Sequence, residues 1–212
     1  MKNESRDYDI IIIGAGLVGL SASLLMSRKI ENILVLDNKQ EDSFHSLPES
    51  EDPYQGVKSI ALSLSSTKIF EAIGIWKDIK KDAAIIEKVH VSSKGDVGSV
   101  VLSASEIGEE VLGYNVANTI LYSSLYRKVK SAKIDFQYDS NLEGISCKKD
   151  HVEICFRVNA KVEKKNLSAD LLIVTDGLNS KSSGLLGIDS EDHSPLQEAI
   201  FTNIFLSKPT LN

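Results

Sequence analysis

The first 40 residues alternate between apolar runs and polar breaks in an order that predicts strand, turn, helix and strand. Residues 10–13 are four consecutive isoleucines, and such a β-branched run is typical of a strand buried on both faces of a parallel sheet. Residues 17–29 carry apolar side chains at helical spacing, and residues 33–36 form a second apolar run. Together they have the length of one βαβ unit, which is about 30 residues.

The rest of the chain predicts further helices and strands around a long polar loop at residues 38–57. Helical spacing recurs in three segments, at residues 60–76, 116–130 and 180–186. Strand-like runs follow or separate these helices at residues 85–91, 99–103, 134–138, 142–146, 151–158, 169–174 and 199–206.

Composition and charge narrow the class of protein. The 212 residues include 24 Lys and Arg against 30 Asp and Glu, a net charge of −6 that disfavours nucleic acid as a partner. The two cysteines, Cys147 and Cys155, do not make a disulfide framework, and the four histidines lack metal-ligand spacing. The apolar stretch at residues 10–26 is interrupted by three glycines and preceded by acidic residues. We therefore expect a cytoplasmic protein with no metal site and no membrane span.

A glycine motif stands at the first predicted turn. Gly14, Gly16 and Gly19 have the spacing GxGxxG, and Asp37 ends the next strand. Gly14 permits a tight turn, Gly16 lets a pyrophosphate approach the backbone, and Gly19 allows close packing of helix on strand. The free N–H groups at the helix start would face the anion, and Asp37 would accept hydrogen bonds from a ribose hydroxyl. This context favours dinucleotide binding over a purely structural turn, but it does not separate FAD from NAD.

Three segments together carry a family resemblance. At DIIIIGAGLVG (residues 9–19), KSIAL (58–62) and LLIVTDG (171–177), the chain resembles the flavin-dependent aromatic hydroxylases of ubiquinone biosynthesis. Within that family, HVSSKGDVG (90–98) and the LGY of residues 112–114 look most like the 2-polyprenyl-6-methoxyphenol hydroxylases. The resemblance covers essentially the whole chain, which corresponds to the amino-terminal half or so of a full-length member.

The resemblance implies an α/β fold with a Rossmann-like FAD-binding βαβ core and part of a mainly β substrate domain. The core would comprise residues 1–74 and 116–188. Residues 75–115 would contribute strands to the substrate domain, and residues 189–212 would begin its truncated continuation.

The resemblance also implies an activity. The family consists of FAD-dependent monooxygenases, and the expected reaction is hydroxylation of a polyprenylated phenol with NAD(P)H as reductant and O₂ as oxidant. The flavin performs the redox chemistry while the protein positions it and excludes water, so no catalytic side chain is expected. Such a substrate implies transient peripheral contact with a membrane, and other quinone-pathway proteins are expected partners.

The cofactor-binding residues follow position by position from the resemblance. The pyrophosphate cradle would be Gly14, Ala15, Gly16, Leu17 and Gly19. Asp37 would hold the adenosine ribose, and Lys58 stands where the family usually has an arginine near the flavin phosphates. A lysine keeps the charge but loses the planar fork, which predicts weaker FAD affinity.

Two later positions are matched as well. Asn118, at the start of a predicted helix, would either contact the cofactor or only cap the helix. Asp176 and Gly177 match an Asp-Gly motif whose aspartate lies beside the FAD and is implicated in handling the nicotinamide nucleotide, although a strand ending in Thr-Asp-Gly is also a common turn. The family often has an arginine where Ser183 stands, and its later Gly-Asp motif does not follow Gly177.

Two alternatives stay open. The first is a truncated, non-catalytic FAD-binding or assembly module. It is favoured by Lys58 and Ser183, which stand where the family often has arginines. The second is an NAD-dependent Rossmann dehydrogenase. The pattern of the first 37 residues fits it equally well, but the segments at residues 58–62 and 171–177 would have no role in it.

Overall fold

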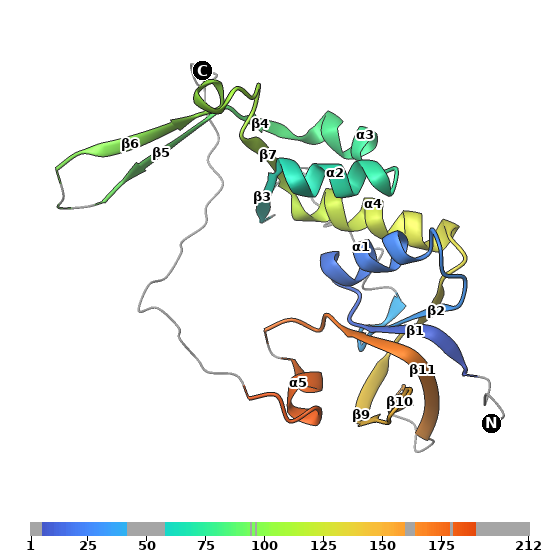
Figure 1. Cartoon of the computed structure of the whole chain (residues 1–212). Coiled ribbons are helices and arrows are strands. Elements are labelled where there is room, and N and C mark those ends of the chain that lie inside the picture. The colour runs from blue at the N-terminus through green and yellow to red at the C-terminus, as the bar shows by residue number, and fades with distance from the viewer. Residues whose placement is uncertain are drawn as a thin grey trace.

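The computed structural model describes residues 6–41, 58–93, 95, 97–159, 164–178 and 180–189. Its centre is a six-stranded sheet with the strand order β8-β2-β1-β11-β10-β9 (Figure 1). The strands, in chain order, are β1 (Tyr8–Ile13), β2 (Ile33–Leu36), β8 (Asp135–Gln137), β9 (Ser140–Cys147), β10 (Val152–Val158) and β11 (Lys164–Val174). The first four in the sheet order run parallel, and β10 and β9 are antiparallel. The α/β class predicted from the sequence is therefore confirmed.

Strand β11 belongs to both parts of this sheet. Its first half pairs antiparallel with β10, and from Ala169 to Val174 it pairs parallel with β1. In this register Val174 lies opposite Ile13, and Ile13 lies opposite Leu36 of β2. The carboxyl ends of β2, β1 and β11 therefore lie side by side, and ligands of open α/β sheets bind at such ends.

The four isoleucines of β1 are buried on both faces of the sheet. Ile10 and Ile12 pack in a cluster with residues of α1 (Leu17–Met26) and α4 (Asn118–Ser131), which cover one face (Figure 1). Ile11 and Ile13 pack in a second cluster with residues of β9 and β10 on the other face. Burying each such side chain contributes about 1.5–3 kcal/mol, so this run fixes β1 at the centre of the core.

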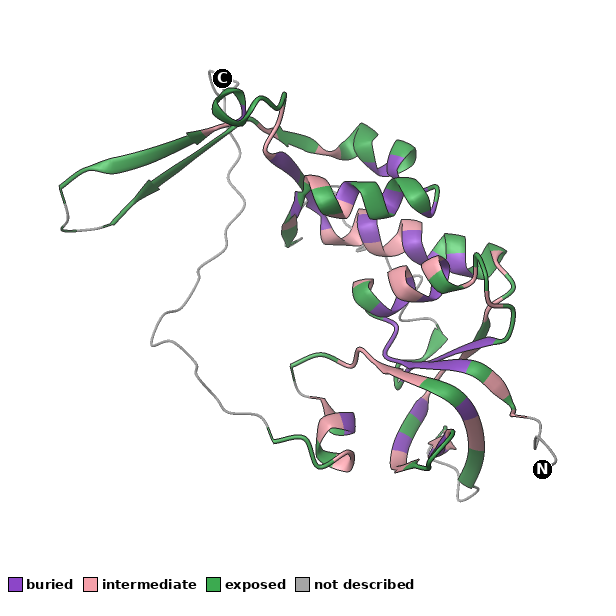
Figure 2. Ribbon diagram, viewed as in Figure 1, coloured by how far each residue is buried: buried purple, intermediate pink, exposed green. Residues whose placement is uncertain are grey.

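A second layer of elements lies beyond α4. A three-stranded antiparallel sheet has the order β3-β7-β4. These strands and the helices around them are β3 (Ser59–Ser63), α2 (Leu64–Ala72), α3 (Trp76–Ile79), η2 (Lys80–Asp82), β4 (Ala84–Ile86), η3 (Ala104–Ile107) and β7 (Gly113–Ala117). A ribbon of β5 (Lys88–Ser92) and β6 (Ser99–Ser103) projects from this layer, and nearly all of its described residues are exposed (Figure 2). The last helix of the described residues, α5 (Lys181–Leu185), packs near β9.

Several predicted elements were wrong in their extent. The strand expected at residues 169–174 begins five residues earlier, at Lys164, and the helix expected at residues 17–29 ends at Met26. Three others differ as follows. The helix expected at residues 60–76 begins as strand β3, because this segment pairs with β7; α2 starts only at Leu64 and ends before Gly74, whose φ is +77°. The strand expected at residues 85–91 is split into β4 and β5, which belong to different sheets. The helix expected from residue 116 begins at Asn118, since residues 116 and 117 end β7.

Some predictions lie outside the described residues. These are most of the loop at residues 38–57 and the strand at residues 199–206. Within the part of the chain that is described, no helix has both the length and the apolar character needed to cross a membrane.

Candidate cofactor-binding site

A crevice of about 330 Å³ opens at the carboxyl ends of β1, β2 and β11. Five of the residues predicted from the sequence line it together, namely Gly14, Gly16, Asp37, Asp176 and Gly177. They come from three strand ends that are far apart in the chain. The crevice is therefore a candidate nucleotide site in the position expected for an open α/β sheet.

The three glycines of the motif have two different roles. Gly14 has a φ of +97°, and a side chain there would lie 2.7 Å from the Thr175 carbonyl oxygen. A side chain at Gly19 would collide with the Gly14 carbonyl oxygen. At Gly16, by contrast, an added Cβ would meet no described atom within 4 Å. Gly14 and Gly19 thus allow the turn to pack, whereas Gly16 leaves open space for a ligand.

Helix α1 starts at this open space. Gly16 is its N-cap residue, with extended backbone geometry, and no described side chain caps the helix. The N–H groups of the first helical turn have no partners within the helix, and the helix dipole adds partial positive charge there. Together with the room at Gly16, this arrangement suits a phosphate or pyrophosphate group. The residues present therefore fit the pyrophosphate of a dinucleotide.

Asp37 connects the second strand to the glycine turn. The residue is only 8% exposed. One carboxylate oxygen accepts a hydrogen bond from the Ala15 N–H at 2.6 Å, and the other accepts one from the Lys39 N–H at 2.8 Å. Each carboxylate oxygen has two lone pairs, so acceptor capacity remains for a ribose hydroxyl. Asp37 therefore anchors the turn and also lies in the crevice.

Asp176 is held in the crevice by two serines. The Ser180 hydroxyl donates to one carboxylate oxygen at 2.6 Å, and the Ser182 N–H donates to the other at 3.1 Å. Burial acts to raise the pKa of Asp176, but these hydrogen bonds outweigh it and hold the pKa below its usual value. The carboxylate is therefore charged at neutral pH. Gly177, with a φ of +88°, then turns the chain toward α5.

Lys58 and Asn118 do not line the described part of this crevice. They lie next to each other, because the Asn118 N–H donates to the Lys58 carbonyl oxygen at 2.9 Å. Ala117 is the N-cap of α4, so the capping role considered for Asn118 is not what the structure shows. The Asn118 Oδ1 atom is buried and has no hydrogen-bond partner among the described residues. Such an acceptor is expected to find a donor, so cofactor contact stays a prediction for Asn118 and Lys58.

Sequence reasoning missed Thr175, Lys39 and Lys181, which also line the crevice. The Thr175 hydroxyl lies 2.8 Å from the carbonyl oxygens of both Ile13 and Gly14. A threonine at the end of a predicted strand gives no local signal of this contact, since its partners are more than 160 residues away in the chain. The only sequence signal for Thr175 is that it directly precedes Asp176.

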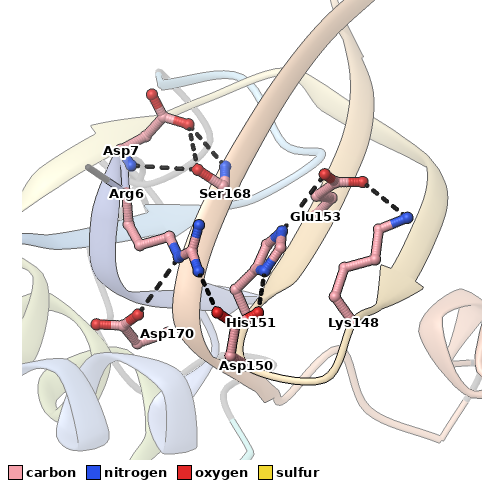
Figure 3. A network of polar contacts seen from close by, with 8 residues as sticks. All are labelled: Arg6, Asp7, Lys148, Asp150, His151, Glu153, Ser168 and Asp170. Atoms are coloured by element: carbon pink, nitrogen blue, oxygen red, sulfur yellow. Dashed lines mark hydrogen bonds and ion pairs between the residues drawn. The ribbon is translucent and has the colours of Figure 1, made fainter. Parts of the chain in front are cut away.

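A larger hollow of about 520 Å³ lies on β9, β10 and β11, away from the glycine turn. Three polar residues of its lining, Asp7, Glu153 and Ser168, are engaged with one another or with close neighbours (Figure 3). The Asp7 carboxylate accepts from the N–H and the hydroxyl of Ser168, each at 2.8 Å, and Glu153 contacts Lys148 and His151. None of the motif residues lines this hollow, so the smaller crevice is the better candidate site.

The relatives found among curated proteins include two whose names refer to ubiquinol or ubiquinone. The chain is 23% identical to 3-demethoxyubiquinol 3-hydroxylase of Escherichia coli (strain K12), over 87% of this chain and 45% of that protein. It is 25% identical to the mitochondrial ubiquinone biosynthesis monooxygenase COQ6 of Dictyostelium discoideum, over 96% of this chain and 44% of that protein. The chain thus spans less than half the length of these relatives.

Comparison with solved structures shows the fold. The crystal structure of p-nitrophenol 4-monooxygenase PnpA from Pseudomonas putida DLL-E4 matches with a TM-score of 0.65 and 17% identity, over 85% of this chain and 43% of that one. Residues 7–212 match the family model described as FAD binding domain. Since that match covers nearly the whole chain, and since the crevice has the features that a dinucleotide requires, this chain belongs to the FAD binding domain family.

Proposed function

We propose that this chain is the FAD-binding portion of a flavin-dependent monooxygenase that hydroxylates a polyprenylated phenol in ubiquinone biosynthesis. NAD(P)H would be the reductant and O₂ the oxidant. The observation that carries the proposal is the junction of the open Gly16 position, the start of α1 and Asp37 in one crevice. The names of the two relatives, a demethoxyubiquinol hydroxylase and a ubiquinone biosynthesis monooxygenase, support the substrate class.

Each residue of the site has a part in holding FAD. The N–H groups at Gly16 and Leu17 would receive the pyrophosphate, and Asp37 would accept hydrogen bonds from the adenosine ribose. Lys58 would supply positive charge near the phosphates. The Asn118 Oδ1 atom, which has no partner among the described residues, would accept a hydrogen bond from the cofactor. When bound, FAD supplies the electron transfer from NAD(P)H and the activation of O₂.

Asp176 would act on the nicotinamide ring of NAD(P)H during hydride transfer. Its carboxylate is charged and fixed by Ser180 and Ser182. A fixed negative charge in the crevice would help orient the positively charged ring that forms as NAD(P)H gives up its hydride.

The division of the chain belongs to the same proposal. Residues 1–74 and 116–188 form the FAD-binding core, residues 75–115 contribute strands to a substrate domain, and residues 189–212 begin its continuation. Because the chain spans less than half of its relatives' length, the complete reaction is assigned to this chain together with the remaining part of such an enzyme. Transient contact with a membrane surface, a cytoplasmic location and complexes with other quinone-pathway proteins are further parts of the proposal.

A non-catalytic FAD-binding or assembly module is the second candidate. It is favoured by Lys58 and Ser183, which stand where the family often has arginines. The Ser183 hydroxyl is instead used locally, donating to the Ser180 hydroxyl oxygen at 2.9 Å. An NAD-dependent dehydrogenase has no such support, because the family match over residues 7–212 is to an FAD binding domain.

FAD titration of the purified chain, followed by quenching of flavin fluorescence, tests the proposal. We expect the wild-type chain to bind FAD and Gly16→Val to bind it at least about tenfold more weakly, because the added side chain fills the space for the pyrophosphate. Gly144→Ala is the matched control, since an added Cβ there makes only an ordinary contact with Cys155. Equal affinity of Gly16→Val and wild type would contradict this site.

Activity separates the two candidates. The chain is mixed with the remaining part of a homologous enzyme, and reduction of its bound flavin by NADH or NADPH is followed by the loss of yellow absorbance without oxygen. Bleaching supports the monooxygenase, whereas bound flavin that is never reduced supports the non-catalytic module.

A further inference from the structure

We propose that Thr175 is a positioning residue that holds the glycine turn in the geometry that receives the FAD pyrophosphate. This inference rests on the proposed FAD site and adds a residue that the glycine motif does not contain. Thr175 is argued to act through the turn and not by touching the cofactor's reacting atoms.

The Thr175 hydroxyl bridges two consecutive carbonyl groups of the turn. It lies 2.8 Å from the Ile13 oxygen and 2.8 Å from the Gly14 oxygen. The Thr175 N–H also donates to the Ile13 oxygen at 2.7 Å. The end of β11 is therefore attached to the end of β1 at the residue where the chain leaves the sheet and enters the turn.

The backbone and side chains at this junction are closely packed around Thr175. A side chain at Gly14 would lie 2.7 Å from the Thr175 carbonyl oxygen, and one at Gly19 would lie 2.6 Å from the Thr175 hydroxyl oxygen. Thr175 thus lies where β11, the turn and α1 converge. A shift of its hydroxyl would displace the Gly14 carbonyl and, with it, the following peptides that begin α1.

Asp37 holds the same turn one residue later, through the Ala15 N–H at 2.6 Å. The two side chains bind different backbone groups of the turn. Thr175 donates to a carbonyl oxygen, and Asp37 accepts from an N–H. With the Ala15 N–H already engaged, the pyrophosphate must be received by the next N–H groups, at Gly16 and Leu17. The placement of those groups therefore depends on both anchors.

Three substitutions separate the hydroxyl from the shape of Thr175. Thr175→Ser keeps the hydroxyl and removes a methyl group. Thr175→Val keeps the shape but places a carbon where the hydroxyl oxygen lies, although carbon and carbonyl oxygen normally stay about 3.3–3.6 Å apart. The turn must then move away by roughly half an ångström. Thr175→Ala removes the hydrogen bonds without forcing this movement.

The test compares the dissociation constants of FAD, ADP and adenosine for these variants, together with the thermal melting of the ligand-free proteins. Losing a hydrogen-bonded anchor is worth about tenfold in affinity. We expect Thr175→Val to bind FAD and ADP about tenfold more weakly, Thr175→Ser to stay within about twofold of wild type, and Thr175→Ala to fall between them. Adenosine has no phosphate, so its affinity should change by less than about twofold.

The inference is overturned if Thr175→Val, or Thr175→Ala where the valine variant does not fold, binds FAD as tightly as wild type. It is also overturned if Thr175→Ser is as weak as Thr175→Val, or if adenosine binding falls as much as ADP binding, because either result indicates only a general structural role. Failure of the wild-type chain to bind FAD or ADP would instead overturn the proposed function, and this inference with it.

Discussion

At the scale of single residues, the two aspartates of the crevice, Asp37 and Asp176, have different structural roles. Asp37 accepts hydrogen bonds from backbone N–H groups and thereby holds the glycine turn. Asp176 is itself held, by a serine hydroxyl and a backbone N–H of the segment that leads into α5. Both carboxylates are thus positioned by hydrogen bonds from the protein itself, an arrangement that favours binding with little reorganisation.

Asp176 makes the stability of the folded chain depend on pH in a defined direction. Its pKa is lower in the folded chain than in the unfolded one, so its contribution is present above the unfolded pKa and is lost as pH falls through the folded value. We expect Asp176→Asn to lower the free energy of unfolding by about 1 kcal/mol at pH 7, and this difference from wild type to shrink as the pH falls below about 4.

Urea unfolding curves at pH 7 and at lower pH measure this difference. Asp189→Asn is the control, because Asp189 is exposed and the variant removes a carboxylate near the same helix. A difference for Asp176→Asn that persists unchanged into acid would contradict the role assigned to its charge.

At the scale of elements, the sequence predicts what is decided locally and misses what is decided by distant partners. Strand β2 has the predicted bounds, because its buried run is unambiguous. The segment at residues 59–63 resembles a helix in its spacing, yet pairing with β7, some 50 residues later, makes it a strand. The glycine motif is readable from spacing alone, whereas the contact of Thr175 with Ile13 depends on strand pairing across most of the chain.

The change from β3 to α2 does have a local signal, which is the side chain of Ser63. As the N-cap of α2, it accepts a hydrogen bond from the Ser66 N–H at 3.2 Å. We expect Ser63→Ala to reduce the free energy of unfolding by about 1 kcal/mol. Ser65→Ala, at an exposed position inside the same helix, should cause no loss, because alanine is the better helix former. Denaturant unfolding measures both, and equal losses would show that Ser63 does not act as a cap.

At the scale of the whole molecule, the ribbon of β5 and β6 lies apart from the two hydrophobic clusters on the faces of the central sheet. Its cross-strand pairs Val89–Leu102 and Val91–Val100 place four aliphatic side chains on one face, and they are 38–58% exposed. Its other face carries mostly polar side chains. An isolated two-stranded ribbon is marginally stable in water, and an exposed apolar face favours association. We therefore expect the ribbon to affect the solubility of this chain more than its stability.

This difference is measurable with matched valine-to-threonine substitutions. The double variant Val91→Thr/Val100→Thr keeps the β-branched shape and adds polarity on the exposed face, so we expect an unchanged melting temperature and less self-association in light scattering. Val116→Thr, at a position only 1% exposed in β7, should instead lose about 1–3 kcal/mol, because it buries a hydroxyl in the core. If the ribbon variant lost as much stability as Val116→Thr, the ribbon would have to be packed against the rest of the molecule, and its exposed apolar face would not exist in solution.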